Sequence, residues 1–121
     1  MNKIFIILLL SISNSYLSIV PSFAEENKIK IGLLVPLTGN NAEIGKQIIK
    51  ATRLALNDIK SDRIEIFPRD TQSNPNQTLR SANELNQLGI NLIVGPVFHE
   101  NLIYLDEIKD VTFLSLSLIH I

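Results

Sequence analysis

The feature that most constrains this fold is an alternation of short apolar runs with longer segments of helical periodicity. The run KIKIGLLVP, residues 28–36, alternates at first and then becomes continuously apolar, which is typical of a strand buried on both faces. Apolar residues then recur at spacings of three and four, which places them on one stripe of a helix of about four to five turns: Ile44, Ile48, Ala51, Ala55 and Ile59. Asn41 can cap this helix, because its side-chain oxygen can accept an amide of the first turn.

The same alternation continues along the chain. Residues 63–68 predict a second strand, and Asn74-Pro75 opens a second helix that Gly89 ends. The apolar face of this helix contains Leu79, Ala82, Leu85 and Leu88. Residues 90–95 predict a third strand, 101–109 a weaker helix and 111–115 the start of a fourth strand. Strands that alternate with helices at this spacing form right-handed βαβ units, so we expect an α/β fold with a parallel sheet.

An open parallel sheet binds ligands at the carboxyl ends of its strands. Three loops are expected at that edge: Thr38–Asn41, Asp70–Asn74 and Pro96–Asn101. The first belongs to the stretch PLTGNNAEIGKQ, which has the look of a phosphate-binding loop. That motif needs four residues between its glycine and the Gly-Lys pair, then Ser or Thr, whereas five residues separate Gly39 from Gly45 and Gln47 follows Lys46. We therefore set nucleotide hydrolysis aside and expect helix-start amides that suit a carboxylate as much as a phosphate.

The start of the chain has the pattern of a secretory signal peptide. Lys3 supplies the positive region, IFIILLLSI the apolar core, and Ser22-Phe23-Ala24 a small-x-small cleavage site, so residues 1–24 are predicted to be removed. A membrane anchor is the competing interpretation, but five Ser and Asn residues dilute the apolar stretch. Without the leader the net formal charge is near −2, which is not the basic footprint of a nucleic-acid-binding protein. The chain has no cysteine and therefore no disulfide framework, which fits a bacterial periplasm better than a small extracellular domain. Together with the signal peptide, this predicts a periplasmic protein.

Three stretches in the same order resemble the type I periplasmic binding proteins of the leucine/isoleucine/valine-binding family. These are IKIGLLVPLTGNNAEIGKQIIKATRLALNDI, RDTQSNPNQTLRSANEL and GINLIVGPV, and the likeness covers residues 25–115, the predicted mature chain. The resemblance implies a Rossmann-like parallel sheet in the order 2-1-3-4, forming the first part of the N-terminal lobe. It also implies a non-enzymatic receptor without a cofactor, which closes two lobes on a small polar ligand such as an amino acid and delivers it to the membrane subunits of an ABC transporter.

Carried over by position, the ligand contacts of the family fall on three loops of this chain. The resemblance assigns them to Gly39, Asn40 and Asn41, to Phe98, His99 and Glu100, and to the region of Ser115. Amino-acid binders of the family typically carry Ser or Thr hydroxyls where this chain has Phe98-His99-Glu100-Asn101. The chain also resembles penicillin-binding protein activators, which regulate peptidoglycan synthesis by contacting a penicillin-binding protein. A solute receptor and a regulatory interaction module are therefore both open.

Several other polar residues are expected to have structural or solvent-exposed roles and not to bind a metal or take part in catalysis. His99 and Glu100 are adjacent but lack the further ligands that a metal needs, so a solvent-facing loop is expected and no metal is assigned. Asp70 is expected to form an Asx turn with the following loop. Residues 116–121, LSLIHI, are spelled by the codons CTG TCT CTT ATA CAC ATC of a transposon adapter used in sequencing libraries. We expect them to be adapter-derived and the biological sequence to end near Ser115.

Overall fold

The computed structural model describes residues 27–117. The predicted signal peptide and residues 118–121 of the predicted adapter-derived tail lie outside this part of the chain. The elements are β1 (Ile29–Val35), α2 (Ala42–Ile59), β2 (Ile64–Asp70), α3 (Pro75–Gln87), β3 (Leu92–Val94), the 3₁₀ turns η1 (His99–Leu102) and η2 (Leu105–Glu107), and β4 (Thr112–Leu114). None of the helices between residues 27 and 117 is both long enough and apolar enough to cross a bilayer.

The four strands form one parallel sheet in the order β2-β1-β3-β4, which confirms the expected α/β fold. In the register of the sheet, Gly32 of β1 lies beside Phe67 of β2 and beside Ile93 of β3. The edge strand β2 contains Pro68, which a sheet tolerates at an edge because proline has no amide to donate. The chain thus leaves β1 toward β2 on one side and returns to β3 on the other.

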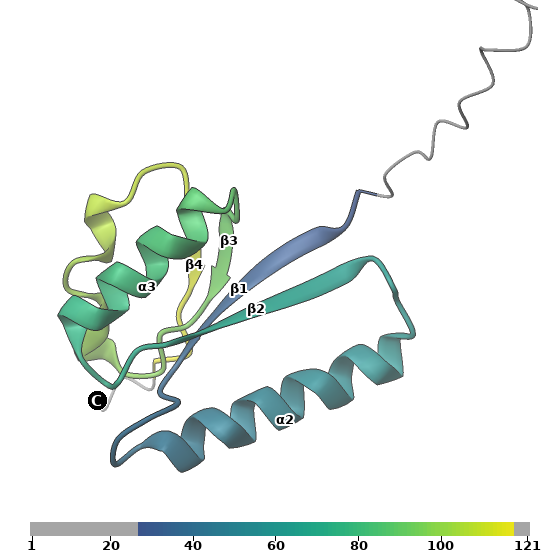
Figure 1. The fold of residues 1–121 in the computed structure, drawn as a ribbon, viewed down its shortest axis with the longest axis horizontal. Coiled ribbons are helices and arrows are strands. Elements are labelled where there is room, and N and C mark those ends of the chain that lie inside the picture. Colours follow the sequence, from purple (N-terminus) through teal and green to yellow (C-terminus); the bar gives the residue numbers. More distant parts are fainter. Residues whose placement is uncertain (1–26, 118–121) are drawn as a thin grey trace, which may run out of the picture.

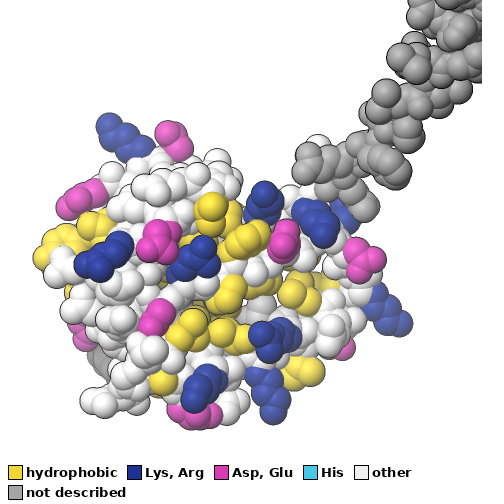
Figure 2. Space-filling model, in the orientation of Figure 1, with side chains coloured by type: hydrophobic (Ala, Val, Ile, Leu, Met, Phe, Trp, Pro, Cys, Tyr) yellow, Lys and Arg dark blue, Asp and Glu magenta, His cyan; other side chains and the backbone are white. Residues whose placement is uncertain are grey.

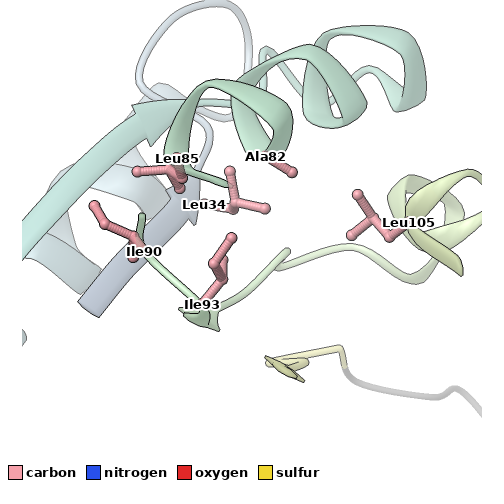
Figure 3. Packing of buried hydrophobic residues seen from close by; sticks show 6 residues of the cluster. All are labelled: Leu34, Ala82, Leu85, Ile90, Ile93 and Leu105. Atoms are coloured by element: carbon pink, nitrogen blue, oxygen red, sulfur yellow. The ribbon is translucent and has the colours of Figure 1, made fainter. Parts of the chain in front are cut away.

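The core lies between α3 and one face of the sheet. Figure 3 shows Leu34 and Ile93 from the strands approaching Ala82 and Leu85 from α3, with Ile90 and Leu105 completing the cluster. A side chain at Gly32 would run into Leu85, so the glycine allows α3 to lie close on β1. Successive strand residues alternate between faces, so the buried Leu33 and Val35 belong to the face opposite the one that packs on α3. Figure 1 shows α2 and α3 running along different sides of the strands.

Helix α2 forms as predicted, but its apolar stripe does not face the sheet as a whole. Ile44 and Ile59 are 43% and 60% exposed, and Gly45 is the buried residue of the helix. The less exposed residues are Ile48, Ile49, Thr52 and Leu56, so the packed face is rotated from the predicted one. The reason is steric, because Gly45 allows the first turn of α2 to press on the preceding loop. In Figure 2 hydrophobic side chains reach the surface between α2 and the strands, among Lys and Arg side chains.

The predicted third helix is wrong in type. Residues 99–107 form two short 3₁₀ turns, η1 and η2, instead of an α-helix over 101–109. Apolar residues recur here at intervals of three, the period of a 3₁₀ helix, and all pack in or against the core: Leu102, Leu105, Ile108 and Val111. The apolar residues of α3, Leu79, Ala82, Leu85 and Leu88, also recur at intervals of three, so this spacing alone did not separate the 3₁₀ segment from an α-helix.

Candidate functional site

The loops that follow the strands meet at one edge of the sheet, as expected for parallel strands. The Thr71 amide, just after β2, donates to the Val35 carbonyl at the end of β1 (3.0 Å). The Gly95 amide, just after β3, donates to the Leu114 carbonyl at the end of β4 (2.8 Å). Since β1 lies between β2 and β3, the strand order reverses at β1 and β3, and this point is where open α/β sheets place their ligands.

The β1–α2 loop, residues 36–41, presents an exposed turn at this edge. Gly39 has a φ of 81°, a left-handed conformation that glycine adopts without steric cost, and both Gly39 and Asn40 are exposed. Gly45 does not belong to this turn. It lies within α2, where a side chain would clash with the Pro36 carbonyl. The two glycines therefore serve different purposes, a turn and a close contact, and do not form a phosphate-binding loop.

Asn41 occupies the cap position of α2, but the predicted capping hydrogen bond is wrong. Its side chain makes no bond to the first turn of the helix. The Asn41 Nδ2 instead donates to the Ser73 Oγ of the β2–α3 loop at 3.0 Å. Asn74 does cap α3 as predicted, because its Oδ1 accepts the Gln77 amide at 3.1 Å and its backbone is extended. Asn41 thus joins two loops of the site.

Asp70 joins the same two loops more extensively. Its Oδ1 accepts the amides of Leu37 and Gln72, both at 2.8 Å, and its Oδ2 accepts the Thr38 hydroxyl at 2.6 Å. The Gln72 contact is the predicted Asx turn, which is confirmed. Burial raises the pKa of Asp70, but hydrogen bonds from the Thr38 side chain and from backbone amides outweigh it and hold that pKa below its ordinary value.

The loop after β3 begins with a close contact to β1. Gly95 has a φ of 108°, and a side chain there would clash with the Leu34 carbonyl. Phe98 is half-buried, whereas His99 and Glu100 are exposed and approach each other at 3.8 Å. Both line a shallow hollow of about 690 Å³ that also involves Pro75 at the start of α3. Among residues 27–117 no group of three potential ligands could hold a metal ion.

Ser115 follows β4 at the same edge. It is exposed, and its Oγ accepts the Ser117 amide at 3.0 Å. The next amide, of Leu116, donates to the Pro96 carbonyl at 3.1 Å, so the loops after β3 and β4 are joined. The structure therefore brings all seven predicted site residues to one edge of the sheet, and their contact with a ligand stays a prediction.

Several residues that shape this edge were not singled out from the sequence. Thr38 and Ser73 supply hydroxyls to the contacts between loops, and Gly95 allows β3 to approach β1. Ser81 of α3 is buried and donates to the Asp70 carbonyl at 2.7 Å. The sequence signal for Ser81 is that this polar residue lies on the buried face of α3, three residues after Thr78 and next to Ala82.

Comparisons with known proteins agree with this geometry. The family model described as periplasmic binding protein matches residues 28–103. An uncharacterized protein of Methanocaldococcus jannaschii, MJ1266, is 31% identical over 84 residues, which are 63% of this chain and 20% of that protein.

Solved structures give the same result. A solute-binding protein of an ABC transporter from Rhodopseudomonas palustris, in complex with 3,4-dihydroxybenzoic acid, aligns with a TM-score of 0.69 and 28% identity, covering 75% of this chain and 27% of that one. The C-domain of LpoA from Haemophilus influenzae, a regulator of PBP1A, aligns with a TM-score of 0.60 and 28% identity, covering 71% and 27%.

The branched-chain amino-acid-binding protein LivJ of Streptococcus pneumoniae, in complex with isoleucine, aligns with a TM-score of 0.63 at 24% identity, covering 74% of this chain and 29% of that one, and this likeness shows the fold. The chain thus spans about a quarter of the length of these solved proteins. A four-stranded sheet in the order 2-1-3-4, loops that converge where the strand order reverses, and a family match over residues 28–103 lead to one conclusion. The chain belongs to the type I periplasmic binding proteins.

Proposed function

We propose that this chain supplies one wall of the ligand-binding cleft of a periplasmic solute receptor that serves an ABC transporter. The carrying observation is the exposed turn at Gly39 and Asn40, located where the strand order reverses. Among residues 27–117 the amides of these two residues donate to no backbone carbonyl, so they are available to an acceptor. They lie directly ahead of the N-terminus of α2, whose partial positive charge attracts a negative group.

The ligand class that suits this turn is a small carboxylate, of which an amino acid is one example. A carboxylate can accept the loop amides at one wall, and a second lobe would close over it and exclude water. The half-buried Phe98 offers an apolar surface, whereas the loop that follows it carries no Ser or Thr hydroxyl for an ammonium group. In this loop the ammonium of leucine would have only the Glu100 carboxylate as an acidic side-chain partner, whereas an organic acid needs none. The Rhodopseudomonas palustris relative, which was solved with 3,4-dihydroxybenzoic acid, supports an organic acid.

Binding measurements on the full-length protein that carries this chain test the proposal. Isothermal titration with leucine, isoleucine, valine, benzoate and 3,4-dihydroxybenzoate should give a micromolar dissociation constant for at least one acid. Substituting Asn40→Pro removes one loop amide and should weaken that binding at least fivefold, because proline has no amide to donate. Asn57→Ala, an exposed change on α2 far along the helix, is the matched control. The absence of binding to every compound counts against the receptor.

A second candidate is a regulator of peptidoglycan synthesis that acts through protein contacts. The specific support is the 28% identity to the C-domain of LpoA, a level equal to that of the solute-binding relative. The exposed His99 and Glu100 beside the exposed Ile103 would then belong to a protein-binding surface. Biolayer interferometry against a purified class A penicillin-binding protein distinguishes the two functions, because a receptor gives no signal and a regulator a saturable one that Ile103→Asp abolishes.

A further inference from the structure

A chain of hydrogen bonds runs from helix α3 to the exposed turn of the β1–α2 loop. Ser81 of α3 donates to the Asp70 carbonyl at 2.7 Å, and Ser81 is itself 2% exposed, so this end of the chain is anchored in the protein interior. The Asp70 side chain then receives the Leu37 amide and the Thr38 hydroxyl. The residue after Thr38 is Gly39, where the exposed turn begins.

The same loop is restrained at two other points. A side chain at Gly45 would meet the Pro36 carbonyl, so α2 lies directly against the start of the loop. Asn41 donates to Ser73 at the end of the loop. Residues 36–38 and 41 are therefore held. Within residues 27–117, Gly39 and Asn40 take part in one backbone hydrogen bond, from the Ala42 amide to the Gly39 carbonyl (3.2 Å). The two ends of the loop are thus fixed, and its tip, Gly39 and Asn40, is exposed.

Asp70 supplies the acceptor for the Leu37 amide. The Leu37 amide lies after the last residue of β1 and before the first of α2, so neither element satisfies it. Removing the carboxylate leaves this amide and the Thr38 hydroxyl without their partner, and the loop is then free to take other shapes. Groups that hold a binding site in its bound shape raise affinity because less conformational freedom is lost on binding.

We propose that Asp70 is a positioning residue of the cleft, whose carboxylate holds the β1–α2 loop in the shape that presents Gly39 and Asn40 to the ligand. This inference rests on the proposed function for its consequence, since a fixed tip matters to affinity only if the tip binds. The clamp, by which we mean the hydrogen bonds of the Asp70 carboxylate with Leu37 and Thr38, belongs to the protein itself and can be measured without a ligand. Asp70 does not contact the ligand in this account, because its donors are all within the protein.

The variants separate hydrogen-bonding geometry from charge. Asp70→Asn keeps an oxygen for the Leu37 and Gln72 amides, and its new amide can donate to the Thr38 hydroxyl, which is able to accept. Asp70→Ala removes all three contacts, and Thr38→Val removes one of them. Glu65→Gln changes an exposed acid of the same strand and is the control. Asp70→Asn should behave nearly as the unchanged protein, and Asp70→Ala should not.

The experiment is amide hydrogen exchange on the full-length protein, followed by titration with the acids named above. We expect exchange at Leu37 to rise at least tenfold in Asp70→Ala, by a smaller factor in Thr38→Val, and less than twofold in Asp70→Asn and Glu65→Gln. The dissociation constant should rise in the same order, by tenfold or more in Asp70→Ala, while the melting temperature of Asp70→Asn stays near that of the unchanged protein.

The two readouts fail separately. If Leu37 exchanges equally in Asp70→Ala and Glu65→Gln, the positioning role is overturned whatever binds. If the loop is released but affinity stays within twofold, the tip is not the binding surface, and the positioning role is overturned together with its premise. If no acid binds the unchanged protein, the proposed function fails and the exchange data alone decide whether the clamp exists. Should Asp70→Ala not fold, Thr38→Val and Asp70→Asn give the same comparison.

Discussion

Replacing Gly95 by alanine tests the contact on which the site geometry depends. Gly95 directly follows β3 and lies against the Leu34 carbonyl of β1, and β1 and β3 are the strands at which the sheet order reverses. A methyl group at this position would clash with that carbonyl, which is part of the backbone and cannot rotate away. The φ of 108° adds strain, because L side chains rarely adopt it.

The two penalties have separate magnitudes. Backbone strain at a positive φ costs about 1–3 kcal/mol for a residue with a side chain. Overpacking costs about 1–3 kcal/mol more, since the strands must separate to relieve the clash. Together they predict a loss of about 2–6 kcal/mol in the free energy of unfolding, a large part of the stability of a domain of ordinary size. The loop carrying Phe98 should shift with the strand.

Gly89→Ala is the matched control. Gly89 also has a positive φ, of 76°, but in the described part of the chain no atom outside Gly89 and its two chain neighbours lies within 4 Å of the position of an added Cβ. It therefore carries the strain, about 1–2 kcal/mol, without the clash. Urea denaturation of the full-length protein, followed by circular dichroism, should show Gly95→Ala less stable than Gly89→Ala by at least 1 kcal/mol. Equal losses in the two variants would refute the argument from close packing.

Three further predictions concern the core, a helix cap and pH. Leu85→Ala should lower the free energy of unfolding by about 2–5 kcal/mol in urea denaturation, because Leu85 is fully buried; a loss below 1 kcal/mol contradicts this. Asn74→Ala should cost about 1 kcal/mol in the same assay through loss of the α3 cap, and no change contradicts the capping contact. Hydrogen bonds outweigh burial and hold the pKa of the Asp70 carboxyl below its ordinary value. The contribution of this carboxylate to the free energy of unfolding is therefore complete above the ordinary pKa and is lost as pH falls through the lower pKa of the folded protein. Arg69 pairs with Glu84 at 3.3 Å. The acid limb of the stability profile should therefore be shallower in Asp70→Asn, and an unchanged limb counts against the account.

The sequence predicted the fold well because the relevant signals are local. The continuous apolar run at Leu33 to Val35 marks a central strand, and Asn74-Pro75 marks a helix start, and both depend on residues close in the chain. The 3₁₀ segment was mistaken for an α-helix because periods of three and of 3.6 differ little over ten residues. The packed face of α2 was misplaced because it depends on the contact between Gly45 and Pro36, which local hydrophobicity does not reveal.

The candidate site was predictable in its position and not in its connections. Parallel strands bring the loops after β1 and β3 to one edge, so Gly39 and Phe98 could be grouped from topology, whereas Ser115 was assigned through the resemblance to the family. The bonds from the Leu37 amide to Asp70 and from the Asn41 side chain to Ser73 join residues more than thirty positions apart. Asn41 was therefore assigned a local capping role, although its partner lies on another loop. Such pairings require the strand register, which periodicity does not supply.

The most direct test of the central claim is a hydrogen-exchange footprint of the full-length protein with and without a saturating acid from the panel, 3,4-dihydroxybenzoate first. The account predicts that ligand binding slows exchange in residues 37–42, with a smaller effect in 95–101, and leaves the outer turns of α2 unchanged. Binding that leaves residues 37–42 unprotected would contradict the claim that this edge of the sheet is a wall of the ligand cleft.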